Sequence, residues 1–235
     1  MSCRVALLRM QDDGLVCLPP PRRKNGNGTR YERRTPQAEP ELPLCKPVAQ
    51  LRELRLEIVG GKRDSRLWNE YIARYHYLGY RVLPGAQLRY FAHAEGRIVA
   101  LLGFSAAAWK TAPRDTFIGW TPAQRKVRLH LVVNNARFLI LPWVTSPHLA
   151  SKLLGMAARR LARDWRARYG YSPVLLETFV EKARFRGTCY RAANWIPLGD
   201  TQGRGKLDVL MLRALPIKTV WVLPIARRYR EVLCE

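Results

Sequence analysis

The longest helical pattern of the chain, between residues 146 and 170, constrains the fold more than any other feature. Apolar residues recur there at i, i+4 spacing and form one stripe, made of Leu149, Leu153, Ala157, Leu161 and Trp165. Ser146-Pro147 predicts the N-terminal cap of this helix, and Gly170 predicts its C-terminal end. Apolar segments typical of buried strands lie on both sides, at 138–144 and 174–180. This succession favours an α/β domain.

The other patterns after residue 51 also alternate between helix and strand. Thr121-Pro122 with Gln124 has the residues of a capping box and predicts a helix that runs to about Asn134. Further predicted elements are a helix at 68–77, a hairpin of 87–93 with 97–104, a short helix at 186–193 and a final hairpin of 195–198 with 207–212. We therefore expect a mixed sheet, in an order of elements that resembles the GNAT acyltransferase fold.

The N-terminal part follows a different pattern. Residues 1–18 predict a helix that stops at Asp12-Asp13-Gly14 and a short strand at 15–18, which is typical of the recognition helix and wing of a winged-helix domain. The helices that would precede them are missing, so the chain either begins inside such a domain or carries a frayed helix with a tail. Residues 19–50 are rich in proline and basic residues and are interpreted as a linker, before a main domain at 51–235.

The charge of the chain indicates its partners. The chain has 41 Lys and Arg against 18 Asp and Glu, a net charge of +23, and so large a surplus favours a polyanion such as DNA or RNA. A membrane is the rival partner, but no apolar run approaches the roughly 18 residues of a spanning helix. The sequence shows no signal peptide, and the five scattered cysteines are typical of free thiols in a reducing compartment. These features predict a soluble, cytoplasmic protein.

Basic residues gather in three segments, at 22–24, 125–168 and 182–206. Residues 125–168 contain ten Lys or Arg against one acid, Asp164. The predicted nucleic-acid contacts are Arg22, Arg23, Lys24, Lys152, Arg159, Arg163, Arg166, Arg184, Arg186, Arg204 and Lys206, with Trp195 as a stacking ring. An ordinary solvated helix face is the alternative for the long helix, and a core position is the alternative for Trp195.

Glu177 is the main catalytic candidate, because it is an acid inside an apolar strand. An interior acid must be paired, protonated or bound to a metal. It is either the partner of an arginine or a general base or metal ligand, assisted by His76 or Tyr190. The four histidines show no metal-binding spacing and the main domain has few acids, so a divalent metal remains an open option without assigned ligands. The segment before the long helix lacks the glycine that a pyrophosphate-binding loop needs, which disfavours acyl-CoA.

Three segments carry a resemblance to a known family: 135–144, 173–180 and 186–195. In these the chain resembles the DUF4338 family, which includes the Druantia anti-phage protein DruA and has relatives associated with transposases. The resemblance extends over about residues 1–230 and implies phage defence or mobile-element biology on DNA or RNA, with other defence or transposition subunits as candidate partners. We expect a nucleic-acid-binding protein with a basic groove; the alternatives are a strand-processing enzyme with Glu177 in its site and a CoA-dependent acyltransferase.

Overall fold

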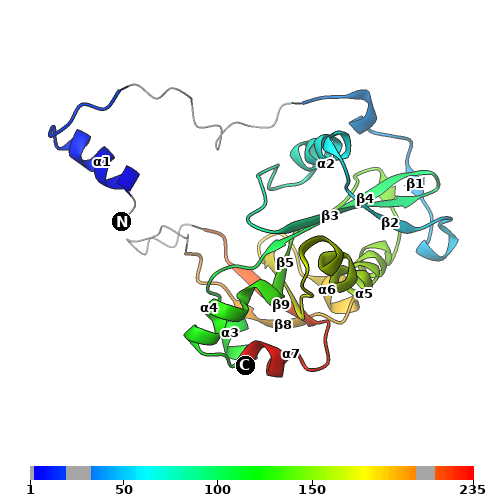
Figure 1. Cartoon of the computed structure of the whole chain (residues 1–235). Coiled ribbons are helices and arrows are strands. Elements are labelled where there is room, and N and C mark those ends of the chain that lie inside the picture. Colours follow the sequence, from blue (N-terminus) through cyan, green and yellow to red (C-terminus); the bar gives the residue numbers. More distant parts are fainter. Residues whose placement is uncertain (1–2, 20–32, 205–214) are drawn as a thin grey trace. The chain divides into compact units, whose positions relative to one another are not determined.

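A computed structural model of the chain describes residues 3–19, 33–204 and 215–235 (Figure 1). The chain divides into two compact units between residues 30 and 31. In the first unit, α1 (Cys3–Asp12) ends at Asp12, within the predicted stop. Gly14 follows with a φ of 71°, and the Leu15 N–H donates to Met10 O. The predicted strand at 15–18 is wrong, because these residues pair with no strand that the structure describes. The winged-helix interpretation stays a prediction.

The second unit is built on a seven-stranded sheet. Its order is β2 (Arg55–Ile58), β3 (Gln87–Ala94), β4 (Arg97–Ala106), β5 (Val132–Ile140), β7 (Leu175–Glu181), β9 (Lys218–Pro224) and β8 (Ile196–Asp200). Only β5 and β7 pair in parallel within this sheet, and their register ends at Asn134 and Glu177, although both strands continue. The structure confirms the predicted mixed sheet in an α/β fold of GNAT-like topology.

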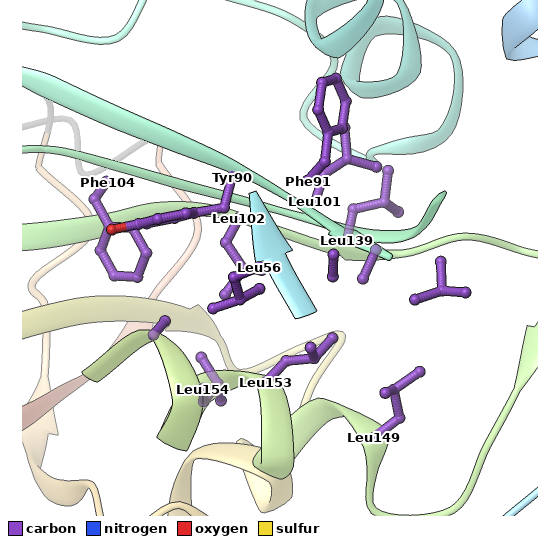
Figure 2. Close-up of a cluster of buried hydrophobic side chains, with 14 of the residues drawn as sticks. Leu56, Tyr90, Phe91, Leu101, Leu102, Phe104, Leu139, Leu149, Leu153 and Leu154 are labelled. Atoms are coloured by element: carbon purple, nitrogen blue, oxygen red, sulfur yellow. The ribbon is translucent and has the colours of Figure 1, made fainter. Parts of the chain in front are cut away.

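Two helices cover opposite faces of the sheet (Figure 1). Side chains alternate between the faces of a strand, and two neighbours on β3 show which helix lies on each face. Arg89 donates to Asn69 and Ser65 of α2 (Lys62–Tyr75), whereas the Tyr90 hydroxyl donates to Asp164 of α5 (Leu149–Tyr169). Figure 2 shows the same division in the core, where Phe91 and Leu101 point toward α2, while Leu153 and Leu154 rise from α5.

The apolar stripe of α5 is buried as predicted, and Gly170 ends the helix in the left-handed region with a φ of 81°. The predicted Ser146-Pro147 cap is wrong. The helix begins at Leu149 after His148, whose φ of 65° turns the chain, and the Leu149 N–H donates to the Ser146 carbonyl instead of a side-chain cap. Before it, β6 (Val144–Thr145) pairs in parallel with β1 (Leu44–Cys45).

The predicted capping box is present at the start of α4 (Pro122–Arg128), where the Thr121 side chain accepts from Gln124 N–H and the Gln124 side chain accepts from Thr121 N–H. The predicted extent of this helix is wrong. A 3₁₀ turn at Leu129–Leu131 follows it, and β5 starts at Val132. The β-branched Val132 and Val133 are fully buried in the sheet, where such side chains pack better than on a helix.

Other predicted elements are present with shifted bounds. The hairpin of β3 and β4 is confirmed, whereas α2 begins six residues earlier than predicted, at Lys62, and the short helix α6 spans Thr188–Ala192. The final hairpin pairs β8 with β9; the predicted strand at 207–212 lies outside the described residues. The patterns did not predict α3 (Ala112–Ile118) or α7 (Tyr229–Cys234).

The segment interpreted as a linker is packed from residue 35 onward. It contains 3₁₀ turns at Pro36–Ala38 and Val48–Gln50, and the Tyr71 and Tyr75 hydroxyls of α2 donate to the carbonyls of Gln37 and Ala38. Ala38 has no exposed surface. From residue 35 onward the linker interpretation is therefore wrong. This segment packs against α2, whose tyrosine hydroxyls satisfy two of the segment's backbone carbonyls.

Candidate functional site

Glu177, the main catalytic candidate, lies in a buried ion pair. Its Oε2 accepts from Arg114 Nη1 at 2.8 Å, and its Oε1 accepts from the Ala108 N–H at 2.8 Å. Neither charged side chain has any exposed surface. Burial raises the pKa of Glu177, while Arg114 and the Ala108 N–H counteract this by favouring the ionised carboxylate. The arginine pairing offered as one alternative from the sequence is the arrangement observed.

The ion pair continues into a charge network that fastens α3 and α4 to the sheet. Asp115 accepts from Arg114 at 2.8 Å and from Arg125 at 3.1 Å, and its Oδ1 also accepts from the Trp120 indole at 3.1 Å. Two arginines thus face two acids, which leaves the network close to neutral. The network is structural: it connects β7 to α3 and α4, the two helices that follow β4.

Tyr190 and His76, the predicted helpers of Glu177, occupy separate environments. The Tyr190 hydroxyl donates to Asn135 Oδ1 at 2.8 Å, and burial raises its pKa above the usual value, so it stays protonated. His76 Nδ1 accepts from the Leu78 N–H at 3.2 Å. Burial, aided by the charge of Arg137, lowers the pKa of His76 to about 4. Among the described residues, no hydrogen bond joins either side chain to Glu177.

The predicted basic face of α5 is exposed. At 100° per residue, Lys152, Arg159, Arg163 and Arg166 fall within one narrow strip opposite the buried stripe, and we call these four residues the α5 strip. Arg163 lies 3.4 Å from Asp164, and the other three have no acidic partner among the described residues. Arg160, on a different side of the helix, is used internally, since it donates to Asp164 and to the Leu56 carbonyl.

The charge of the basic segment at 182–206 is partly neutralised by acidic partners. Lys182 pairs with Asp200 at 2.6 Å and Arg184 with Glu181 at 3.1 Å, whereas Arg186, Arg191 and Arg204 are exposed. Lys206 and the predicted contacts Arg22, Arg23 and Lys24 lie outside the described residues.

Trp195 does not offer the stacking ring expected from the sequence. It is 3% exposed and meets Tyr190 edge to face at 5.1 Å, so it belongs to the core. Among the described residues, the exposed aromatic rings are instead Tyr77, Trp109 and Phe185. Phe185 has a signal in the sequence that was missed, because it stands between two arginines in Arg184-Phe185-Arg186.

The start of α5 offers few of the donors that an acyl-CoA pyrophosphate uses. Such a group needs several free backbone N–H donors at a helix N-terminus. Here Pro147 has none, and the Leu149 N–H already donates to the Ser146 carbonyl. In the described part of the chain, no group of three or more His, Cys, Asp or Glu side chains is placed to hold a metal ion, and no helix is long and apolar enough to cross a membrane.

The chain has an α/β fold with a GNAT-like order of elements, and the solved structures that resemble it include acetyltransferases. They include an aminoglycoside acetyltransferase in complex with coenzyme A and kanamycin (14% identity, 75% of this chain and 98% of that chain, TM-score 0.46). A GNAT-family acetyltransferase from Streptococcus pneumoniae (13%, 73% and 100%, 0.43) and the ribosomal-protein-S18-alanine N-acetyltransferase from Escherichia coli (10%, 73% and 95%, 0.42) are also similar. At these identities the likeness concerns the fold alone.

The family of the chain is shown by its sequence rather than by its fold. The family model of the Druantia protein DruA matches residues 9–216, and the chain belongs to this family. No curated protein matches the chain.

Proposed function

We propose that this protein binds nucleic acid through the α5 strip and acts in anti-phage defence, as its membership of the DruA family suggests. The observation that carries the proposal is the strip itself: four exposed cations on one line of a rigid helix, three of them without an acidic partner among the described residues. A net charge of +23 adds a long-range attraction for polyanions.

The dimensions of the α5 strip fit a phosphate backbone. From Lys152 to Arg166 the helix rises by about 21 Å, at 1.5 Å per residue. Duplex DNA carries about one charge per 1.7 Å of its axis, so a strip of this length faces several phosphates at once. The helix is anchored by its opposite face, which holds the cations in place before any strand arrives.

The alternative of a strand-processing enzyme is less well supported by the geometry. Both oxygens of Glu177 are bonded inside a fully buried pair, and Tyr190 and His76 lie in other environments. The acyltransferase alternative has fewer backbone donors for the cofactor at the start of α5, where Pro147 has no N–H and the Leu149 N–H is already bonded. Binding is therefore the function that the described residues support best.

The test is a titration of labelled DNA and RNA, followed by fluorescence anisotropy at 50 mM and 200 mM salt. We compare the wild type with a variant that carries Lys152→Ala, Arg159→Ala and Arg166→Ala. The matched control carries Lys62→Ala, Arg63→Ala and Arg227→Ala, which removes the same charge from exposed cations outside the strip. All six side chains are exposed, so both variants are expected to fold.

We expect the strip variant to bind at least about tenfold more weakly at 50 mM salt and the control to stay within about threefold of the wild type. Equal losses in both variants would mean that net charge alone attracts the strand. A wild type that binds neither DNA nor RNA at low salt would overturn the proposed function.

A further inference from the structure

A second surface lies where β5 and β7 separate. Beyond the last pair of their register, the chain brings together residues from three elements: Tyr77 after α2, Arg137 on β5, and Arg184 and Phe185 in the turn after β7. The rings of Tyr77 and Phe185 meet edge to face with their centroids 5.2 Å apart. We call Tyr77, Arg184, Phe185 and Arg186 the aromatic–arginine cluster.

Phe185 is exposed although its turn is fixed. The N–H groups of Arg184 and Phe185 both donate to the Glu181 carbonyl, at 3.1 and 2.9 Å, so the backbone presents the ring in a defined position. The residue nevertheless keeps 49% of its surface in contact with water. A half-exposed phenylalanine forgoes part of the burial free energy that it would gain in a core. Such a ring has apolar surface available for a partner.

Tyr77 packs against the Phe185 ring and is itself held by two neighbours. His76 stacks on Tyr77 with centroids 4.9 Å apart, and the Arg184 guanidinium carbon lies 5.3 Å from the centre of the Tyr77 ring. Arg184 is itself held by Glu181 at 3.1 Å. Because Tyr77 already contacts a ring and a cation, Phe185 is the member of the pair that can accept another flat group.

Charge distinguishes this surface from the other exposed aromatic position. Trp109, which is 58% exposed, has Arg125 over its ring, but the two arginines near it, Arg114 and Arg125, are paired with Glu177 and Asp115. Around Phe185 the balance among the described residues is positive, since Glu181 is the one acid that faces the nearby arginines, which are Arg81, Arg137, Arg184 and Arg186. Burial, followed by the charge of Arg81, lowers the pKa of Arg137, as expected where cations crowd together.

An aromatic ring among arginines has the chemistry that recognises a nucleobase with its phosphates. Bases stack on exposed aromatic rings whatever their sequence, and guanidinium groups bind the adjoining phosphates. In a duplex the faces of the bases are covered by their neighbours, so an isolated protein ring can stack only on a base that has left the helix.

We propose that Phe185, supported by Tyr77, stacks on an unpaired base of a nucleic-acid strand, while Arg184 and Arg186 contact the phosphates beside it. This inference rests on the proposed function and adds a preference to it: the α5 strip holds any phosphate backbone, and the aromatic–arginine cluster selects single-stranded segments.

The experiment measures the anisotropy of one labelled oligonucleotide of mixed sequence, free or annealed to its complement, with wild type, Phe185→Leu and Phe185→Trp. Leucine keeps an apolar side chain of similar reach and removes the ring. Trp109→Leu is the matched control, because it removes an exposed ring from another element. A 2-aminopurine base within the single strand reports stacking directly through its fluorescence.

We expect Phe185→Leu to weaken single-strand binding about tenfold and to leave duplex binding within about twofold, with Phe185→Trp restoring the single-strand affinity. Trp109→Leu should bind both forms like the wild type. The 2-aminopurine signal should change when the wild type binds and stay constant with Phe185→Leu.

Three failures are distinguishable. If the wild type binds strand and duplex but Phe185→Leu leaves both affinities and the 2-aminopurine signal unaltered, the stacking inference is wrong and the proposed function stands. If Trp109→Leu alone loses single-strand binding, the stacking site has been misplaced. If the wild type binds neither form at low salt, both the inference and the proposed function are overturned.

Discussion

Arg114 and Glu177 form an ion pair 2.8 Å long in which neither side chain is exposed to solvent. The pair joins the first turn of α3 to the middle of β7, and Asp115 extends it to Arg125 on α4. A buried charge loses its hydration, so such a pair is stable only while both partners and their hydrogen bonds are present. This relationship makes Glu177 a structural residue in the described part of the chain.

Replacing Glu177 by glutamine should therefore destabilise the protein. Glu177→Gln leaves the buried Arg114 with Asp115 as its remaining acid, and we expect the free energy of unfolding to fall by about 3 kcal/mol. Urea unfolding followed by circular dichroism measures this change. A catalytic Glu177 would instead give a variant of unchanged stability that has lost its function.

The double variant Glu177→Gln, Arg114→Met tests the coupling of the pair. Because methionine needs no counter-charge, we expect the double variant to lose at least about 1 kcal/mol less than the sum of the two single losses. Strict additivity would show that the two side chains do not stabilise each other.

Tyr190→Phe should distinguish a structural tyrosine from a catalytic one. The substitution removes the hydroxyl that donates to Asn135 Oδ1 and keeps the ring packed against Trp195. We expect a loss of about 1 kcal/mol of stability, measured by thermal melting, with unchanged nucleic-acid affinity. Loss of phage protection from a variant that remains fully folded at the assay temperature would assign a reactive role to the hydroxyl.

His76 should make stability depend on pH. Its pKa is about 4 in the folded protein and 6.5 when unperturbed, so the unfolded state takes up a proton first as the pH falls. Above pH 6.5 the ring is neutral in both states, and the free energy of unfolding has its full value. As the pH falls from 6.5 toward 4, protonation stabilises the unfolded state alone, and the free energy of unfolding falls by about 3 kcal/mol. His76→Gln keeps an acceptor for the Leu78 N–H but does not titrate. The difference in unfolding free energy between wild type and variant should therefore shrink between pH 7 and 4; a constant difference would contradict this.

Salt dependence should count the phosphates that the α5 strip contacts. For duplex DNA the slope of log affinity against log salt is about −0.9 per neutralised phosphate. The variant with alanine at positions 152, 159 and 166 should have a slope shallower by roughly 2 to 3 than the wild type, if each cation contacts one phosphate. An unchanged slope would place the contacts elsewhere on the protein.

The N-terminal unit should contribute selectivity rather than strength. If residues 1–30 contain part of a reading domain, their deletion should reduce the preference among DNA sequences more than the average affinity. The matched control is Arg22→Gln, Arg23→Gln, Lys24→Gln, which removes only cations that the sequence predicts to contact phosphates and should weaken binding equally on all sequences. Binding to a panel of duplexes measures both effects, and an equal loss in the deletion variant would identify the unit as a basic tail.

Local patterns in the sequence determined much of the fold. The buried stripe of α5, its end at Gly170, the capping box at Thr121 and the hairpin of β3 with β4 all follow from contacts between residues a few positions apart. Such contacts leave a periodicity or a turn signature that can be read directly. The exposed α5 strip follows from the same periodicity, because residues opposite a buried stripe face solvent.

Other features depended on the tertiary structure, because they join residues that are distant in the chain. The sequence showed that Glu177 needed a partner, but Arg114 stands 63 positions away, in a helix that no local pattern revealed. Tyr77 and Phe185 meet where β5 and β7 separate beside the end of α2. Trp195 is buried because it packs against Tyr190 in the core. Local sequence encodes which side chains prefer burial, whereas the neighbour that each one meets is decided by how the whole sheet closes.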